Sequence, residues 1–304
     1  MKLLRFERAG LEGWAVQDDG SGLWHGTTSD AAAYPGALDA AIRAGRQVLD
    51  AVAAVMRAQP TVDLAQVRLL APVAEPRKII CVGLNYRDHT EESGFEQPAY
   101  PTLFSRFNTS VVPHDAPLEH AGDLSDTLDF EGELVAVIGT GGSRIRHEDA
   151  LSHVLAYSVF NDGSMREYQF KTPQWTMGKN FDRTGGFGPW LVTADELPPG
   201  ARGLRLQTRL NGQVVQSANT DDMVFDVASL IVTISEAITL EPGDLIVAGT
   251  PAGIGHAREP RLYMHPGDVC EVEIERIGLL RNRIVSRQPA PTAHPPAHQE
   301  ETTA

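Results

Sequence analysis

Three carboxylates at alternate positions precede an apolar run near the middle of the chain. They are Asp129, Glu131 and Glu133, and the run at 134–138 reads Leu-Val-Ala-Val-Ile. If residues 128–138 form a strand, the three side chains share one face, about 7 Å apart. Either this face is charged and solvated, or it binds a cation, because carboxylates at the end of a buried strand are costly unless they are neutralised. Mg²⁺ and Mn²⁺ prefer such oxygen ligands.

A further acidic residue follows a second apolar segment. Residues 157–161 read as a strand, and Asp162 stands at its end, directly before Gly163. An ordinary turn aspartate is one interpretation. The other is a functional group, because binding and catalytic residues often follow the ends of regular elements. Beyond it, Arg166 and Gln169 share a face if their segment is helical.

A histidine and a glutamate three residues apart could form a proton-transfer pair. If the segment after Tyr86 is helical, His89 and Glu92 lie on one face and can form a hydrogen bond. The glutamate would then orient the imidazole and stabilise its cation while the ring takes a proton from water. The alternative is two solvated side chains on a loop, because Glu91 and Ser93 are also polar.

Lys179 and Thr250 offer donors for an anionic ligand. Lys179 follows Trp175 and Met177, which favours a pocket wall over an ordinary surface position. Its ammonium is a compact charge with three donors. Thr250 lies in a Gly-Thr-Pro-Ala-Gly segment and can present its hydroxyl and backbone N–H groups to a carboxylate.

The composition narrows the partners that these residues could serve. The 304 residues carry a formal net charge of −14, which argues against nucleic acid and against a membrane surface. No apolar run approaches the roughly 18–20 residues of a membrane span, and charges interrupt the first eight residues, so we expect neither a spanning helix nor a secretory leader. The two cysteines, Cys81 and Cys270, lie among apolar residues and indicate buried free thiols in the cytoplasm.

The elements before residue 72 predict a small N-terminal α/β domain. Residues 11–24 read as a hairpin, and the apolar spacing over 35–56 predicts one helix that ends before Pro60. A Pro- and Glu-containing connector at 71–76 then leads into a strand at 78–82. We therefore place a domain over 1–72 and a second one over 73–287.

The second part is rich in strands and lacks the alternation of a doubly wound sheet. Asn211 and Gly212 predict a hairpin over 206–215, and Asp226 can cap a helix. Two Pro-Gly-Asp turns, at 242–244 and 266–268, each precede a strand. The fold class is thus mixed α/β and β-rich. Residues 288–304 read as a disordered tail.

Several motifs in series make the chain resemble the fumarylacetoacetate hydrolase family. The resemblance covers about residues 78–286, in order and with sensible spacing. The motifs are the segment at 80–89, the Glu-x-Glu pair with its later aspartate, Gly-Lys-Asn-Phe-Asp at 178–182 with Gly-Pro-Trp at 188–190, and the closing segment at 240–255. This resemblance implies a β-roll catalytic domain that follows the small N-terminal domain, and it implies a homodimer.

The resemblance also implies roles for individual residues. Glu131, Glu133 and Asp162 match the ligands of a divalent metal, Mg²⁺ or Mn²⁺, which Ca²⁺ could replace in crystals. Lys179 matches a lysine that contacts metal-bound substrate oxygens, and His89 with Glu92 matches a pair on a lid over the substrate. The remaining matches are substrate contacts, which we expect at Arg166, Gln169, Thr250, Tyr86 and Arg106. For Arg166 a structural ion pair is the rival interpretation.

These roles lead to a first hypothesis and two alternatives. The first is a metal-dependent hydrolase that cleaves a C–C bond in acylpyruvates or related 1,3-dicarbonyls, with water activated by His89 and Glu92. An isomerase, decarboxylase or hydratase/lyase of 2-oxo acids would use the same metal site, and a metal-dependent binding protein would not turn its ligand over. The glycine-rich residues 183–187 depart from the fumarylacetoacetate-cleaving branch. Trp175, Met177, Phe181 and Phe187 suggest an aromatic or extended acyl group.

Overall fold

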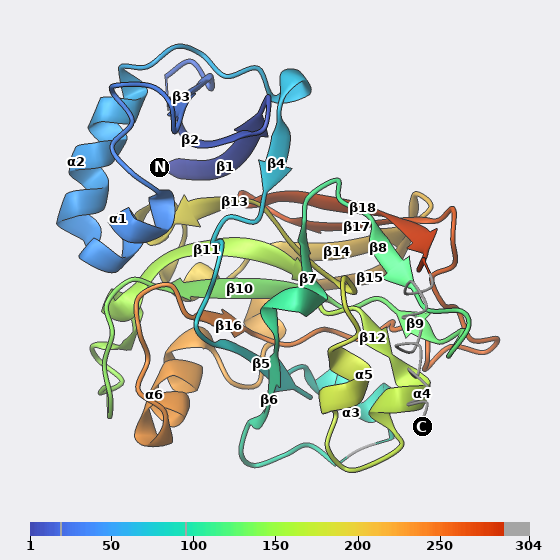
Figure 1. Ribbon diagram of the computed structural model, residues 1–304. Helices are drawn as coiled ribbons and strands as arrows, with labels where there is room; N and C mark the ends of the chain where they lie inside the picture. Colours follow the sequence, from blue (N-terminus) through green and yellow to red (C-terminus); the bar gives the residue numbers. More distant parts are fainter. Residues whose placement is uncertain (19, 95, 289–304) are drawn as a thin grey trace, which may run out of the picture.

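The computed structural model describes residues 1–18, 20–94 and 96–288, and its chain is rich in strands (Figure 1). The predicted tail at 288–304 lies outside the described residues except for its first one. Within the described ranges, no helix is long and apolar enough to cross a membrane.

The N-terminal segment forms a hairpin layer covered by two helices. Strands β1 (Lys2–Arg8), β2 (Leu11–Gln17) and β3 (Trp24–Thr28) pair antiparallel, which confirms the predicted hairpin. The expected single helix is wrong, because the chain forms α1 (Leu38–Ala44) and α2 (Arg46–Arg57). Gly45 separates them with a φ of 96°, a conformation that suits glycine and ends a helix.

One large mixed sheet runs through both predicted domains. Its main path is β3-β2-β1-β13-β11-β10-β16-β5-β6, with β4 on β1 and β7 on β13. The strands after β3 are β4 (Arg68–Leu70), β5 (Ile79–Gly83), β6 (Thr102–Arg106), β7 (Val111–Pro113), β10 (Gly132–Ile138), β11 (Val154–Asn161), β13 (Gly185–Thr193) and β16 (Leu245–Val247). Because β1 pairs with β13, the N-terminal layer continues the sheet of the remaining chain. The division at residue 72 stays a prediction.

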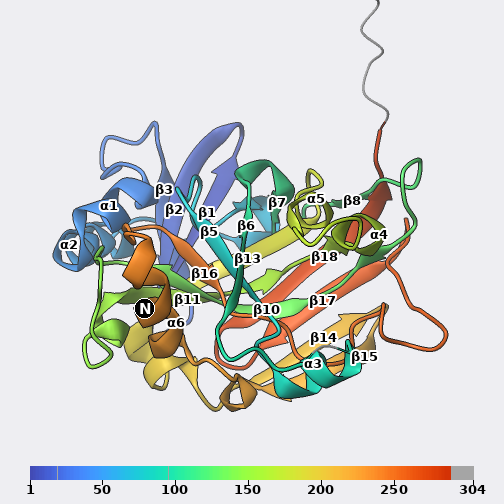
Figure 2. The same cartoon turned by 90° about the horizontal axis from the view of Figure 1, so that it is seen from below.

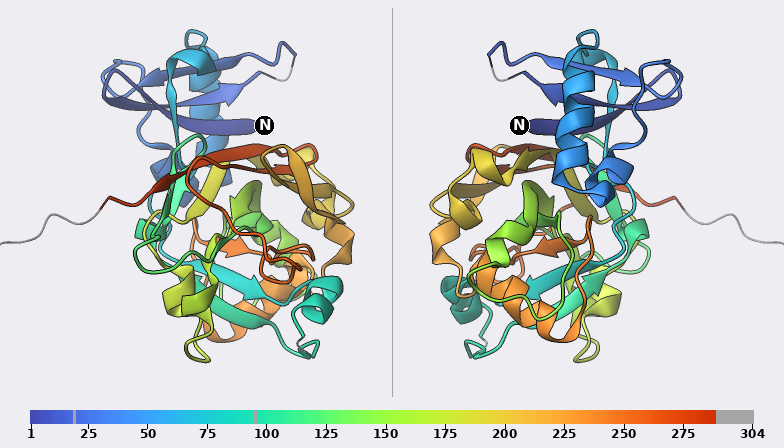
Figure 3. Two further views of the ribbon diagram at one scale, coloured as in Figure 1. Left: turned by 90° about the vertical axis from the view of Figure 1, so that its right-hand side faces the viewer. Right: turned by 90° about the vertical axis from the view of Figure 1, so that its left-hand side faces the viewer.

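A second, five-stranded sheet packs against the large sheet, and the two together form a roll (Figures 2 and 3). Its order is β15-β14-β17-β18-β8. Its strands are β8 (Leu118–His120), β14 (Arg205–Leu210), β15 (Gln213–Asn219), β17 (Val269–Ile274) and β18 (Gly278–Ser286). Asn211 and Gly212 both have positive φ in the predicted hairpin turn, and Asp226 caps α6 (Val227–Ala237) through the backbone N–H of Ser229.

The predicted strand over 128–138 is broken, and this correction matters for the site. It divides into β9 (Leu128–Asp129) and β10, and β9 pairs with β12 (Ser164–Met165) instead of continuing the large sheet. The three alternate carboxylates therefore do not form one row on a strand face. Asp129 belongs to the small sheet, Glu131 lies in the break, and Glu133 lies in β10.

Strand β10 lies between two apolar cores, as expected of a strand buried on both faces. Leu134, Ala136 and Ile138 pack into one core with α6, whereas Val135 and Val137 pack into a second core with α2 and β1. Short helices at the far end of the roll carry His89, Glu92, Arg166, Gln169 and Lys179. They are α3 (Arg87–Glu92), α4 (Arg166–Gln169) and α5 (Thr176–Lys179). The 3₁₀ turns cover Leu64–Gln66, Asn108–Ser110, Ala150–His153, Ala194–Glu196, Pro199–Ala201 and Thr220–Asp222.

Candidate active site

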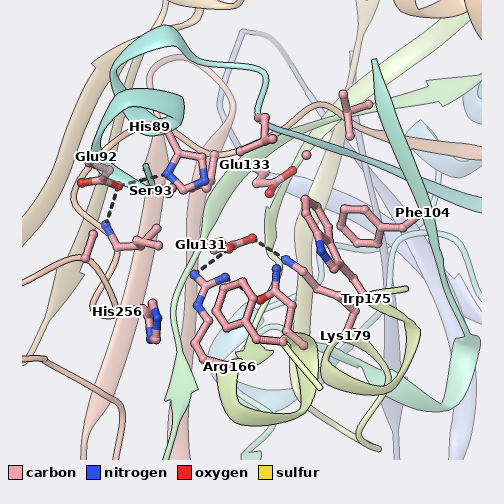
Figure 4. Close-up of a pocket in the computed structure, with 18 residues that line it drawn as sticks. His89, Glu92, Ser93, Phe104, Glu131, Glu133, Arg166, Trp175, Lys179 and His256 are labelled. Atoms are coloured by element: carbon pink, nitrogen blue, oxygen red, sulfur yellow. Dashed lines mark hydrogen bonds and ion pairs between the residues drawn. The ribbon is translucent and has the colours of Figure 1, made fainter. Parts of the chain in front are cut away.

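A pocket of about 350 Å³ opens where β5, β6, the start of β10 and the three short helices meet. Eighteen residues line it (Figure 4). Of the residues predicted for the site, the lining includes His89, Glu92, Glu131, Glu133, Arg166, Gln169, Lys179 and Thr250. Segments that lie up to 175 positions apart in the sequence, from Val82 to Ala257, thus meet in one cavity.

Glu131, Glu133 and Asp162 form a buried carboxylate cluster at the base of this pocket. One oxygen from each lies within 4.8 Å of the others. The break before β10 creates the cluster, since its backbone is tied to the end of β11: Asp162 N–H donates to the Glu131 carbonyl oxygen at 2.8 Å, and Glu131 N–H donates to Asn161 Oδ1 at 3.0 Å. The structure therefore brings together the three residues that the resemblance assigned to a metal.

Buried cations neutralise two of these carboxylates. Lys179 Nζ donates to Glu131 Oε2 at 2.7 Å and to Asp162 Oδ2 at 2.6 Å. Arg166 Nη2 lies 2.6 Å from Glu131 Oε1, and Arg106 Nη1 donates to Asp162 Oδ1 at 2.5 Å. Burial by itself would raise the pKa of Glu131, but the charges of Arg166 and Lys179 outweigh it and lower that pKa to about 2.

Glu133 is the carboxylate of the cluster that has no cationic contact among the described residues. Its Oε2 accepts the Gly249 N–H at 2.6 Å. Burial, followed by the charges of Asp162 and Glu131, raises its pKa well above the usual value. With Asp129 included, four buried carboxylates face three buried cations, Arg106, Arg166 and Lys179. The fourth carboxyl group, Glu133, therefore needs either a proton or a further cation, and this set of oxygen ligands fits a hard divalent cation.

Asp129 connects Arg166 to the backbone at residues 255–256 and is not part of the carboxylate cluster. Its Oδ2 accepts from Arg166 Nε at 2.8 Å, and its two oxygens accept the backbone N–H groups of Gly255 and His256. The carboxylate thus fixes Arg166 from behind and anchors the 250–257 segment. The rival interpretation of Arg166 as a structural ion pair therefore holds together with its place on the pocket lining.

His89 and Glu92 form the predicted hydrogen-bonded pair on a helix. His89 Nδ1 lies 3.0 Å from Glu92 Oε1, and Glu92 Oε2 accepts the Gly253 N–H at 2.8 Å. The imidazole is buried and lies between the carboxylates of Glu92 and Glu131 (Figure 4). A glutamate held at two points can orient the ring and leaves the other ring nitrogen for proton exchange in the pocket.

Gln169 and Thr250 line the pocket, but the Gln169 amide oxygen and the Thr250 hydroxyl already have partners. Gln169 Oε1 accepts from Arg166 Nη1 at 2.8 Å, so the amide nitrogen remains as its donor toward a ligand. The Thr250 hydroxyl donates to the Gly132 carbonyl oxygen at 3.1 Å and accepts from Gln216 Nε2 at 2.8 Å. Thr250 thereby ties its own segment to the start of β10.

Tyr86 and Arg106 lie behind the lining, contrary to the expectation that both line the pocket. Tyr86 is fully buried in the apolar core that contains α6. Arg106 contacts Asp162, the Gly163 carbonyl and Thr184, so it supports a cluster carboxylate from the far side. Of the four suggested apolar contacts, Trp175 lines the pocket, whereas Phe181 and Phe187 lie in the core and Met177 is 64% exposed.

Some residues that line the pocket had no predicted role. Phe104 and Phe170 add aromatic surface, and His256 lines the opening with Nδ1 2.8 Å from the Tyr263 hydroxyl. Only the position of His256 directly after the closing segment could have indicated it. Trp175 packs over Gly83, where a Cβ atom would come within 2.3 Å of the indole.

A roll of strands that encloses clustered carboxylates, buried cations and a histidine–glutamate pair is the arrangement of an enzyme for a small polar molecule. The chain belongs to the fumarylacetoacetate hydrolase family. The family model described as fumarylacetoacetate (FAA) hydrolase C-terminal matches residues 78–285.

Named relatives and solved structures place the chain within this family more closely. It is 37% identical over 291 residues to the mitochondrial oxaloacetate tautomerase Fahd2a of Rattus norvegicus, covering 94% of this chain and 92% of that protein. It is 40% identical to the oxaloacetate tautomerase YisK of Bacillus subtilis (strain 168), over 73% of this chain and 74% of that protein. The fumarylacetoacetate hydrolase structure from Exiguobacterium antarcticum is 38% identical, with a TM-score of 0.82 over 94% of this chain and all of that one. The tautomerase names favour the isomerase alternative over C–C hydrolysis.

Proposed function

We propose that this protein is a metal-dependent tautomerase that interconverts the enol and keto forms of a short 2-oxo dicarboxylic acid such as oxaloacetate. The observation that carries the proposal is the position of the His89–Glu92 pair across the pocket from Lys179 and Arg166 (Figure 4). The names of the similar tautomerases supply the substrate class. The cavity of about 350 Å³ suits a small ligand.

Glu131, Glu133 and Asp162 would hold Mg²⁺ or Mn²⁺. The Lys179 ammonium, which contacts Glu131 and Asp162 in the structure, would then contact the bound substrate. When bound, the metal supplies Lewis acidity that stabilises negative charge on the oxygen at C2 of the acid. Lys179 adds a second positive charge at the same side of the pocket, and Arg166 with Gln169 offers N–H donors to a carboxylate.

Tautomerisation needs one proton at C3 and the loss of one from the C2 hydroxyl. In the enol-to-keto direction the charged His89 ring gives its Nε2 proton to C3, while Glu92 holds the Nδ1 side and stabilises that charge. The proton lost from the C2 hydroxyl passes to solvent, which protonates His89 again. The carbon–carbon bonds stay intact, and water is not consumed. The chemistry therefore requires the same pair that the hydrolase hypothesis used for water, but without a leaving group.

Hydrolysis of an acylpyruvate remains the second candidate, because the same His89–Glu92 pair could activate water. The two functions differ in their products. Hydrolysis releases two acids, decarboxylation releases CO₂, and tautomerisation changes only the enol fraction. Assaying all three on one preparation separates them.

The experiment uses the full chain with Mg²⁺ or Mn²⁺ and freshly dissolved enol oxaloacetate, followed by the decay of enol absorbance. Metal without protein corrects for the spontaneous reaction. We expect decay faster than this background, loss of the excess rate with EDTA, and a roughly 10²–10⁴-fold lower kcat/KM for His89→Ala. The exposed Met177→Ala serves as the matched control. Acylpyruvate cleavage without tautomerisation, or full activity in the chelated protein, would overturn the proposal.

A further inference from the structure

Two histidines and an aspartate outside the pocket bring their donor atoms together. His120 ends β8, Asp126 follows in the next loop, and His265 lies in the loop before β17. One donor atom from each lies within 4.8 Å of the others. None of these residues lines the candidate active site. Because their sequence spacing is irregular, only the fold reveals the cluster.

The His120 ring has a polar atom that the described part of the chain leaves without a hydrogen bond. His120 is 4% exposed, and its Nε2 has no hydrogen-bond partner there. Asp126 Oδ1 lies 3.7 Å away, too far for a hydrogen bond, and the His265 ring centroid lies 5.6 Å from that of His120. A buried nitrogen in this state costs free energy unless something else binds it.

The donor set selects the kind of ligand. Two imidazoles with one carboxylate suit Zn²⁺, Co²⁺ or Ni²⁺, whereas Mg²⁺ prefers oxygen ligands throughout. We propose that His120, Asp126 and His265 form a second metal site, separate from the carboxylate cluster, for Zn²⁺ or a similar transition-metal ion.

The surroundings leave room for the ion and for adjustment of its ligands. Ligand atoms around a tetrahedral Zn²⁺ lie about 3.3–3.5 Å apart, so the cluster needs to contract by up to about 1.4 Å. Asp126 and His265 are exposed and can rotate, and solvent can supply a fourth ligand. Gly122 keeps the space beside them open, since a Cβ atom there would lie 3.0 Å from the His120 ring and 3.5 Å from Asp126 Oδ1.

An ion at this site would join two loops that support the pocket. The loop with Asp126 reaches α4, because Arg166 N–H donates to the Thr127 carbonyl oxygen at 3.1 Å. The loop with His265 continues from the segment that contains His256. The ion would therefore stabilise the pocket's frame without contacting the ligand in it.

The test titrates Co²⁺ into the full chain with excess Mg²⁺ present to load the carboxylate cluster. Replacing His294 and His298 by alanine in every sample removes two imidazoles that precede the C-terminus. We expect about one equivalent of Co²⁺ with the visible absorbance of a nitrogen-ligated, low-coordinate ion, displaced by Zn²⁺. Zn²⁺ should also raise the Tm.

His265→Ala and Asp126→Asn alter exposed ligands, and His120→Gln alters the buried one. Each should weaken Co²⁺ binding at least about 10-fold, as the loss of even an outer-shell partner does. Exposed His147→Ala is the control and should bind as the unaltered background does. If His120→Gln fails to fold, the two exposed variants still decide. Equal Co²⁺ affinity, spectrum and Tm shift in the His265→Ala, Asp126→Asn and His147→Ala proteins would overturn the proposal.

Discussion

Lys179 is a buried cation in the wall of the pocket. Its ammonium is buried and contacts two of the three clustered carboxylates. Burial opposes its charge, but Asp162 and Glu131 outweigh burial and raise the pKa of Lys179 above its ordinary value. The side chain therefore remains a fixed cation, available to carboxylates and to a ligand oxygen alike.

Replacing Lys179 by methionine should separate catalysis from metal binding. We expect kcat/KM to fall about 10²–10³-fold, because a donor to developing oxyanion charge is lost. Mg²⁺ affinity, measured calorimetrically, should not weaken, since a competing cation has gone from the cluster. The exposed Lys171→Met is the control. Unchanged turnover in Lys179→Met would contradict the role proposed for this residue.

Glu133 makes metal binding depend on pH. Its pKa is raised by burial and by the carboxylates of Asp162 and Glu131, so a proton competes with the cation for this group. Mg²⁺ affinity should rise with pH and level off once the pH exceeds that raised pKa, and binding near neutral pH should release up to about one proton. Calorimetry in two buffers of different ionisation enthalpy measures the release. Glu133→Gln should abolish it; identical enthalpies for the unaltered protein would contradict the prediction.

At the scale of elements, close packing of α4 against α5 sets the positions of Arg166, Gln169 and Lys179. Gly178 permits this contact: a Cβ atom there would lie 2.4 Å from the backbone nitrogen of Gln169. Backbone cannot yield as a flexible side chain can. The two helices would have to separate.

Gly178→Ala should consequently impair activity by moving several groups at once. We expect kcat/KM to fall about 10²-fold or more, because displacements near 1 Å have that effect on catalysis. Met177→Ala, on an exposed neighbour in the same helix, should leave activity intact. Tautomerase rates settle the comparison, and equal rates in the two variants would show that α5 tolerates the shift.

Local patterns predicted elements whose signals are short-range. The Asn211–Gly212 turn, the Asp226 cap and the α3 spacing of His89 and Glu92 depend on neighbours in sequence, and all three are confirmed. The break at Glu131 could not be predicted in this way. It depends on β9 pairing with β12, more than thirty residues further along the chain.

The same reason explains the residues placed incorrectly. Tyr86 and Arg106 belong to segments that do contribute to the pocket, but the direction of each side chain follows from packing on other elements. The Glu131, Glu133 and Asp162 cluster was predictable as a set from the resemblance. Its geometry was not, because the cluster depends on the break that the apolar pattern hides.

For the whole molecule, the continuous sheet predicts one unfolding transition. Leu49 of α2 and Val135 of β10 share a core across the predicted boundary at residue 72. Leu49→Ala should lower the free energy of unfolding by about 2–5 kcal/mol. In a urea titration, the activity and the circular dichroism signal should both be lost at the same, lower urea concentration. Exposed Val48→Ala is the control. Activity that survives while the N-terminal core unfolds would indicate two independent domains.

The homodimer and the cytoplasmic location remain predictions about the whole molecule. Sedimentation equilibrium of the full chain tests the first, with twice the 33.0 kDa chain mass as the expected result.

The cations of the pocket are enclosed, and this has a kinetic consequence. Lys179 and Arg166 are buried, while the formal net charge of the chain is −14. A dicarboxylate diffusing from bulk solution is therefore repelled over most of its approach and attracted only on entry. Dissolved salt weakens this long-range repulsion, because the Debye length is only about 10 Å at 0.1 M salt. It weakens the short-range attraction inside the buried pocket much less. Substrate encounter should accelerate with ionic strength, the reverse of an enzyme whose surface charge steers its substrate inward.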